Sequence, residues 1–140
     1  MSRYSGRLSA VSIPQQDLQM RRRFPQFKNV GSPRSAIWIG GLQPLEVSPI
    51  YAVRIQYRVG DIPRVWVIAP ALHERAPHRY TKEDGRLCLY WPREAPWRPD
   101  SVVAETIVPW TALWLFYYEL WLDTEQWLGP TPHGDPVKGG

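Results

Sequence analysis

Cysteine is almost absent from this chain, and its scarcity excludes several kinds of stabilising site. Cys88 is the one cysteine among 140 residues, so no disulfide can form within the chain. Three scattered histidines and one cysteine also give no zinc-ligand spacing, and we therefore expect no metal site. A chain of this length can bury a core large enough to fold as one domain without such staples.

Long apolar runs and nucleotide-binding motifs are missing as well. The longest apolar candidate, residues 107–122, contains Pro109 and Glu119, which argues against a membrane span. No charged segment followed by an apolar one opens the chain, so we expect a cytoplasmic protein without a secretory signal. Neither G-x-x-x-x-G-K-[ST] nor G-x-G-x-x-G occurs, and we expect no cofactor.

Proline and tryptophan are abundant instead, with 15 and 8 residues. The formal net charge is +4, and its one dense cluster is Arg21–Arg22–Arg23. This cluster can contact phosphates or an acidic protein face, but the solvated face of a helix is the interpretation we favour. A nucleic-acid partner is not expected, because the aromatic residues gather in the other half of the chain.

The hydrophobic pattern predicts an α+β fold. We expect a short amphipathic helix over residues 15–24 and strands over 35–42, 50–59 and 64–69, joined as an antiparallel meander. Residues 86–90 form a candidate fourth strand. Helices follow, one starting at Ser101 under an Asp100 cap and a second from Trp110. Residues 1–14 and 128–140 are predicted to be a flexible arm and tail around a domain of residues 15–127.

The second of these helices is apolar on nearly every side, which leaves two interpretations. Its large rings can cover the sheet as core, which is the default for any one of them. There are more rings than one face needs, and Trp and Tyr are enriched at protein interfaces. We therefore expect some of four aromatic residues to meet a partner protein or a second copy of this chain: Trp110, Phe116, Tyr117 and Trp127.

Cys88 by itself favours a structural role, because a thiol between Leu87 and Leu89 is typical of a buried strand. Its surroundings favour chemistry instead. A loop rich in Pro and Gly precedes it, Asp84–Gly85 lies just upstream, and Trp91–Pro92 follows closely. Loops of this kind often position reactive groups.

The residues around Cys88 resemble the ubiquitin-conjugating enzyme (E2) family. His78 stands ten residues before Cys88, as the family's histidine does, Gly85 takes the place of its turn glycine, and Trp97–Arg98–Pro99 is similar to its Trp-x-Pro element. The order of helix, meander and loop also follows the family. The tryptophan-rich C-terminal part looks most like bacterial E2-like proteins encoded beside cGAS-like nucleotidyltransferases in CBASS antiphage defence operons.

The resemblance implies an E2-like fold and roles for single residues. Cys88 would be the nucleophile, His78 would order the loop, and Gly85 and Trp97 would support it. The chain departs from the family at Tyr80, which stands where the family keeps the asparagine that supports the oxyanion. The Tyr80 phenol can donate one hydrogen bond to an oxyanion or simply pack, and the sequence leaves both open.

The implied reaction is acyl transfer. Cys88 would take the C-terminal carboxyl of a ubiquitin-like protein or of a cGAS-like nucleotidyltransferase as a thioester and pass it to an amine. An E1-like activating enzyme is a candidate further partner. The alternative is a catalytically inactive E2-like module that docks a partner through its aromatic helix. Redox sensing by Cys88 ranks last, because no second cysteine can resolve an oxidised thiol.

Overall fold

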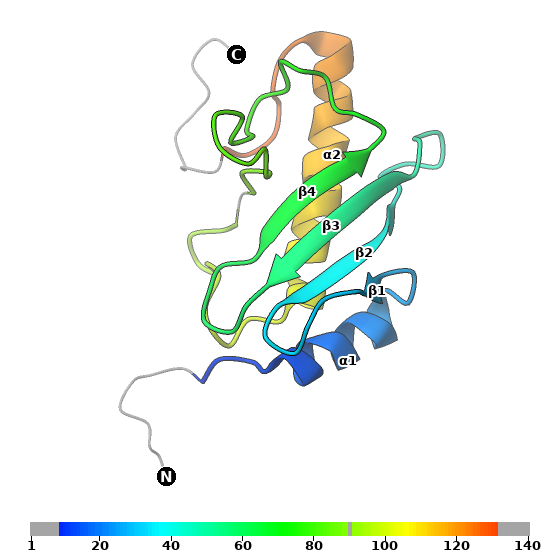
Figure 1. The fold of residues 1–140 in the computed structure, drawn as a ribbon. Coiled ribbons are helices and arrows are strands. Elements are labelled where there is room, and N and C mark those ends of the chain that lie inside the picture. Colours follow the sequence, from blue (N-terminus) through cyan, green and yellow to red (C-terminus); the bar gives the residue numbers. More distant parts are fainter. Residues whose placement is uncertain (1–8, 90, 132–140) are drawn as a thin grey trace.

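The fold is a four-stranded antiparallel sheet with a short helix at one end and a long helix across one face (Figure 1). The computed structural model describes residues 9–89 and 91–131. The strand order is β1-β2-β3-β4, so the predicted meander and the α+β class are confirmed. Its elements, in chain order, are α1 (Ile13–Arg23), β1 (Lys28–Asn29), β2 (Ala36–Leu42), β3 (Tyr51–Tyr57), β4 (Arg64–Ala69), the 3-10 turn η1 (Val103–Glu105) and α2 (Ile107–Thr124).

The fourth strand is not the predicted one. It is β1, a two-residue strand that pairs with β2 through Lys28 opposite Ile39. At residues 86–89 the structure has one isolated bridge, between Arg79 and Leu87, instead of a strand. β1 could not be predicted, because two residues carry no detectable period of two.

Alternation along β3 builds the core. Tyr51, Val53, Ile55 and Tyr57 are buried on one face, while the residues between them are half-buried on the other. Register places Ile55 beside Trp38 of β2 and Val65 of β4, all of them essentially inaccessible to solvent. Figure 1 shows α2 running behind this sheet, and its buried residues complete the core.

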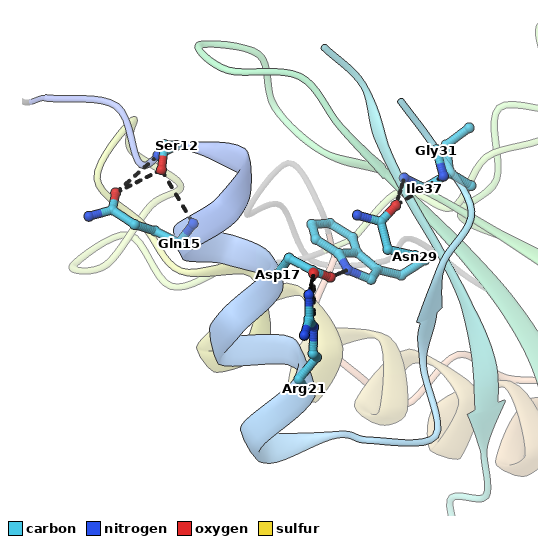
Figure 2. A network of polar contacts seen from close by, with 8 residues as sticks. Ser12, Gln15, Asp17, Arg21, Asn29, Gly31 and Ile37 are labelled. Carbon is cyan, nitrogen blue, oxygen red and sulfur yellow. Dashed lines mark hydrogen bonds and ion pairs between the residues drawn. The ribbon is translucent and has the colours of Figure 1, made fainter. Parts of the chain in front are cut away.

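Helix α1 begins two residues before its predicted start, at a capping box formed by Ser12 and Gln15. The Ser12 hydroxyl accepts the Gln15 backbone N–H, and the Gln15 side chain accepts the Ser12 N–H. Asp17 then ties the helix to the sheet, because its carboxylate accepts Trp38 Nε1–H at 2.9 Å and Arg21 at 2.9 Å (Figure 2).

Arg21, Arg22 and Arg23 lie exposed in the last turn of α1. Cations are favourable there because they face the negative end of the helix dipole. Arg21 is paired with Asp17 and Arg23 with Glu105, at 2.9 and 3.0 Å. The solvated helix face that we expected for this cluster therefore accounts for it.

The C-terminal helices differ from the prediction. No helix starts at Ser101 and Asp100 caps none; residues 103–105 form the 3-10 turn, and α2 begins at Ile107. Pro109 does not interrupt α2, because it lies in the first turn, where backbone N–H groups have no partner within the helix. The described residues thus hold one long C-terminal α-helix.

Two polar side chains join elements through the interior. Gln16 of α1 is fully buried and bonds Ser101 O and Val103 N, each at 2.9 Å. Glu119 of α2 accepts the Ser48 hydroxyl at 2.6 Å and the Tyr51 hydroxyl at 2.7 Å. A carboxylate on an apolar helix is tolerated there because its oxygens are bonded.

After α2 the chain turns back through Glu125, whose φ is 62°, and runs beside the loop that follows β4 (Figure 1). We call residues 127–130 the C-terminal strap. Trp127 is 7% exposed, and its Nε1–H bonds Pro130 O at 3.0 Å. Gly129 lies so close to the Tyr117 ring that an added Cβ would be 2.5 Å from it.

The other end of the described chain is also attached to the domain. Val11 N–H bonds Pro99 O at 3.1 Å, and Val11 O accepts the Tyr57 hydroxyl at 2.6 Å. Residues 1–8 and 132–140, with most of the predicted arm and tail, lie outside the described residues, and the division into arm, domain and tail stays a prediction. Within the described ranges, no helix has the length and apolar character to cross a membrane.

Candidate active site

Residues 78–88 form a small hairpin that holds Cys88. Tyr80 N–H bonds Arg86 O and Cys88 N–H bonds His78 O, each at 2.9 Å, on either side of the Arg79–Leu87 bridge. This register places Tyr80 opposite Arg86 and His78 opposite Cys88. Residues two apart in extended chain lie on the same face, so Tyr80 is a diagonal neighbour of Cys88. The ten-residue spacing between His78 and Cys88 is the spacing of a directly paired position.

The hairpin is fastened to the edge of β4. Leu87 N–H bonds Val65 O at 2.8 Å, and Trp66 Nε1–H bonds Asp84 O at 3.0 Å. Gly85 closes the turn at φ 79°, a conformation that glycine adopts without strain, and its N–H bonds Tyr80 O at 2.9 Å. The predicted role of Gly85 as a turn residue therefore has a backbone reason.

The Cys88 side chain is buried, with 9% of the residue exposed, and contributes to two cavities. One is an open cleft of about 370 Å³ between the hairpin and the β3–β4 connection, and its wall includes Asp61, Pro63, Arg64, Tyr80, Arg86, Trp91 and Ile107. The other is a small space of about 20 Å³ under the C-terminal strap, shared with Trp110, Trp114, Tyr117, Trp127 and Pro130. Cys88 therefore lines an open cleft and also the space under the strap.

Burial dominates the electrostatics of the thiol. It raises the pKa of Cys88 above its ordinary value, because a thiolate is poorly solvated there. The hydrogen bond from Tyr80 and the charge of Arg86 act in the opposite direction, and Glu83 adds to the rise. Burial also raises the pKa of Tyr80, and the interaction with Cys88 raises it further. The phenol therefore stays a hydrogen-bond donor at neutral pH.

Sequence reasoning missed Arg86. Its guanidinium carbon lies 4.2 Å from the centre of the Tyr80 ring, and its Nη1 contacts the carboxylates of Glu83 and Asp84 at 3.2 and 3.0 Å. The signal was available, because Arg86 stands two residues before Cys88 and an extended segment places such residues on one face.

His78 acts on the site through its backbone as well as its ring. Its φ is 59°, and its carbonyl accepts both Cys88 N–H and Trp114 Nε1–H, the latter at 3.3 Å. Its ring lies edge-on to Trp127, with centroids 4.8 Å apart. These contacts join the hairpin to α2 and to the strap, which supports an ordering role for His78 over one in proton transfer.

Trp97 is not among the residues that line the two cavities beside Cys88. It packs against Tyr57 with ring centroids 6.2 Å apart. Its supporting role is therefore at most indirect, through the path of the chain from Trp91 to η1, and it stays a prediction.

The four aromatic residues predicted to bind a partner fall into two groups. Trp110, Phe116 and Tyr117 are half-buried on α2, and Leu113 between them is 43% exposed. Trp127 is buried against His78, Trp114 and Tyr117. A partner could contact the Trp127 ring only if the strap, to which Trp127 belongs, moved away from the domain. Partner binding by all four residues stays a prediction.

No candidate metal centre accompanies this site within the described residues, where no three His, Cys, Asp or Glu side chains gather closely enough to hold an ion. His73 lies apart, with Nδ1 accepting Arg75 N–H and its ring against Trp121. His133 and Tyr90 lie outside the described residues.

Comparison with known proteins supports the resemblance seen around Cys88. A search of curated proteins found no match. The family model described as "Type II CBASS E2 protein" matches residues 16–134, which include the whole hairpin, both cavities and α2. Because this match spans most of the 140 residues, the chain belongs to the Type II CBASS E2 family.

Proposed function

We propose that this chain is an E2-like conjugating enzyme of antiphage defence, which carries an acyl group as a thioester on Cys88 and transfers it to an amine. Membership of the CBASS E2 family indicates an E2-like role in defence. The observation that supports the chemistry is the position of Cys88 in the wall of an open cleft that is also lined by Tyr80, its diagonal neighbour in the hairpin.

We also infer that the fold is the E2 fold. The chain begins with a helix, continues through a four-stranded meander, and carries its cysteine on a loop docked at the last strand. A helix then covers the sheet from behind (Figure 1). The order of these elements is the one implied by the resemblance, with α2 in place of several C-terminal helices.

The first step is thioester exchange or acylation at Cys88. The thiolate attacks the activated C-terminal carbonyl of the donor, a bond from sulfur to the acyl carbon forms, and the bond to the leaving group breaks. If the donor arrives on an E1-like enzyme, the leaving group is that enzyme's thiolate, which accepts the proton released by Cys88. The cleft beside Cys88 has room for the last few residues of an extended donor chain.

The second step is aminolysis. An acceptor amine attacks the same carbonyl, a carbon–nitrogen bond forms, and Cys88 departs as a thiolate that takes up the proton lost by the amine. The oxyanion of the tetrahedral intermediate needs a donor close to the sulfur. Tyr80 lines the same cleft as Cys88 and its raised pKa keeps the hydroxyl protonated, so the phenol can serve in place of the family's asparagine.

The raised pKa of Cys88 has a consequence for the rate of charging. At neutral pH the thiol is mostly protonated, so the charging rate should rise as pH increases toward the pKa of Cys88. A protonated, covered thiol also reacts slowly with small oxidants, which protects it between turnovers.

The donor that we favour is the cGAS-like nucleotidyltransferase of the defence system, with a ubiquitin-like protein as the second choice. The test uses the purified chain, the candidate donor and an E1-like activating enzyme with ATP. We expect an adduct on a non-reducing gel that disappears with reductant. Cys88→Ser should give an adduct that resists reductant but not alkali, because an ester replaces the thioester, and Cys88→Ala should give none.

The burial of Cys88 also supports a second candidate function, in which the chain is an inactive E2-like module that docks a partner through α2. The two functions separate in cells challenged with phage. The enzyme predicts that Cys88→Ala abolishes protection. The docking module predicts that Cys88→Ala protects normally, while charged substitutions at Trp110 and Phe116 abolish protection. An unreactive Cys88 in the folded protein, together with no reducible adduct in extracts, would exclude the enzyme.

A further inference from the structure

The Tyr80 ring is held by a cation. The Arg86 guanidinium carbon lies 4.2 Å from the centre of this ring, at the directly opposite position of the hairpin. Stacking of a planar guanidinium on an aromatic face is favourable and restricts both side chains. The phenol could otherwise rotate away from the sulfur, because Tyr80 is half-buried at the cleft.

The guanidinium is itself fixed in place. Its Nη1 contacts Glu83 Oε1 at 3.2 Å and Asp84 Oδ1 at 3.0 Å, and the side chain is 24% exposed. Asp84 is anchored in turn, because its carboxylate accepts Arg86 N–H at 3.2 Å and its carbonyl accepts Trp66 Nε1–H at 3.0 Å. Arg54 covers Trp66 from the next strand, with its guanidinium carbon 5.0 Å from the ring centre. The contacts that hold Arg86 over the Tyr80 ring therefore extend from the hairpin to strands β4 and β3.

We propose that Arg86 is a positioning residue for the acyl-transfer reaction, which holds the Tyr80 phenol against the Cys88 sulfur. This inference rests on the proposed function of Cys88 as the nucleophile. It requires the planar guanidinium and not just a positive charge, because a flat group stacked on the ring fixes its plane, whereas an ammonium does not.

Three parts of the fold surround Cys88, and two of them carry other charges. In the hairpin, Glu83 and Asp84 offset part of the Arg86 charge, and His78 lies opposite the thiol. From the β3–β4 connection and β4, Asp61 and Arg64 face the same cleft. The residues of α2 and of the strap that share a cavity with Cys88 carry no charge: Ile107, Trp110, Leu113, Trp114, Tyr117, Trp127 and Pro130. Arg86 and Tyr80 are the groups that lower the pKa of Cys88 against the effect of its burial.

The test is the pH profile of Cys88 alkylation by iodoacetamide, which needs no donor protein. Four variants are compared with the unaltered chain: Tyr80→Phe, Arg86→Met, Arg86→Lys and the double variant Tyr80→Phe/Arg86→Met. Both Tyr80→Phe and Arg86→Met should shift the midpoint to higher pH, and a shift of one unit lowers the rate near pH 7 about tenfold. Arg23→Met serves as the control, because it removes the exposed ion pair between Arg23 at the end of α1 and Glu105 of η1, and it should leave the profile unchanged.

The decisive comparison is between the effect of Arg86→Met in the unaltered chain and its effect in the Tyr80→Phe background. If Arg86 acts by holding Tyr80, Arg86→Met should change the profile less in the Tyr80→Phe background than in the unaltered chain. Arg86→Lys should recover only part of the lost rate. Full recovery by lysine would mean that charge alone matters, and equal effects of Arg86→Met in both backgrounds would mean that Tyr80 is not involved. Either result overturns the proposal.

This result is separable from that of the proposed function. If the alkylation profiles behave as expected but no reducible adduct with a donor forms, the positioning of Tyr80 stands and the enzyme fails. If the adduct forms as fast with Arg86→Met as with the unaltered chain, the enzyme stands and the positioning role fails. Thermal unfolding of each variant checks that the fold is intact, and Arg86→Lys keeps the ion pairs should Arg86→Met fail to fold.

Discussion

Trp127→Ala is the perturbation that tests the C-terminal strap most directly. Trp127 is 7% exposed, and its ring lies 4.8 Å from His78, 5.6 Å from Trp114 and 6.1 Å from Tyr117, centroid to centroid. A buried tryptophan removes roughly 200 Å² from water, which at about 25 cal/mol per Å² corresponds to about 5 kcal/mol. We expect a loss of about 3 kcal/mol, because a strap at the end of the domain can relax more than a closed core.

The same change should expose the thiol. Cys88 shares the space under the strap with Trp127 and Pro130, so opening the strap uncovers the face of the thiol that lies away from the cleft. A loss of about 3 kcal/mol raises the population of the open form by about 100-fold. We expect the rate of Cys88 labelling by a bulky maleimide to rise at least about tenfold, since part of the labelling already occurs through the cleft.

Urea unfolding measures the first effect and native-state maleimide labelling the second. Leu128→Ala is the matched control, because Leu128 is the next residue of the strap and is 54% exposed; its cost should stay below about 0.5 kcal/mol. Gly129→Ala should act like a weaker Trp127→Ala, because its Cβ would meet the Tyr117 ring at 2.5 Å. A Trp127→Ala protein with unchanged stability and an unchanged labelling rate would refute the covering role of the strap.

Three further predictions concern the scaffold of the site. Burial of Asp17 favours its neutral form, but the hydrogen bond from Trp38 and the contacts with Arg21 outweigh it and hold the pKa of Asp17 below 3.8. Its stabilising effect is therefore present above about pH 4 and is lost as pH falls through the folded-state pKa, so Asp17→Asn should cost about 2 kcal/mol in urea unfolding at pH 7 and progressively less as the pH is lowered below about 4. Glu119→Gln should cost about 2 kcal/mol in the same assay, because one carboxylate serves two hydroxyl donors; an equal cost in a Tyr51→Phe background would contradict this account. Gly85→Ala should cost about 1 kcal/mol in thermal unfolding through its positive φ alone, since no atom lies within 4 Å of the added Cβ, and a neutral effect would show that the turn relaxes.

The candidate site was predictable where residues act through local spacing. The ten-residue spacing from His78 to Cys88 and the glycine three residues before the thiol are the connectivity of one hairpin, and a hairpin determines which residues face each other. The period of two in β3 likewise identified its buried face, because one side of an antiparallel strand must leave water. For the same reason Arg86 could have been predicted beside Cys88.

Helix boundaries and the role of the aromatic residues were less accessible. Two helices were predicted on either side of Pro109, one from Ser101 and one from Trp110, but the effect of a proline depends on its position in the helix, and that position was determined by where α2 begins to pack. Glu119 looked like an interruption of an apolar run until the fold brought Ser48 and Tyr51 to its oxygens.

By itself, then, the sequence determined the class of fold and the order of strands from β2 to β4, whereas it predicted a strand around Cys88 where the structure has a single bridge. The class of fold and the strand order follow from periodicity and spacing within a few residues along the chain. Only the tertiary structure decided that Cys88 is buried, that the Arg86 guanidinium lies over the Tyr80 ring, and that Trp127 lines a space shared with Cys88. Burial and the pKa of a thiol depend on residues distant in sequence, because desolvation is set by every segment that excludes water from the same point.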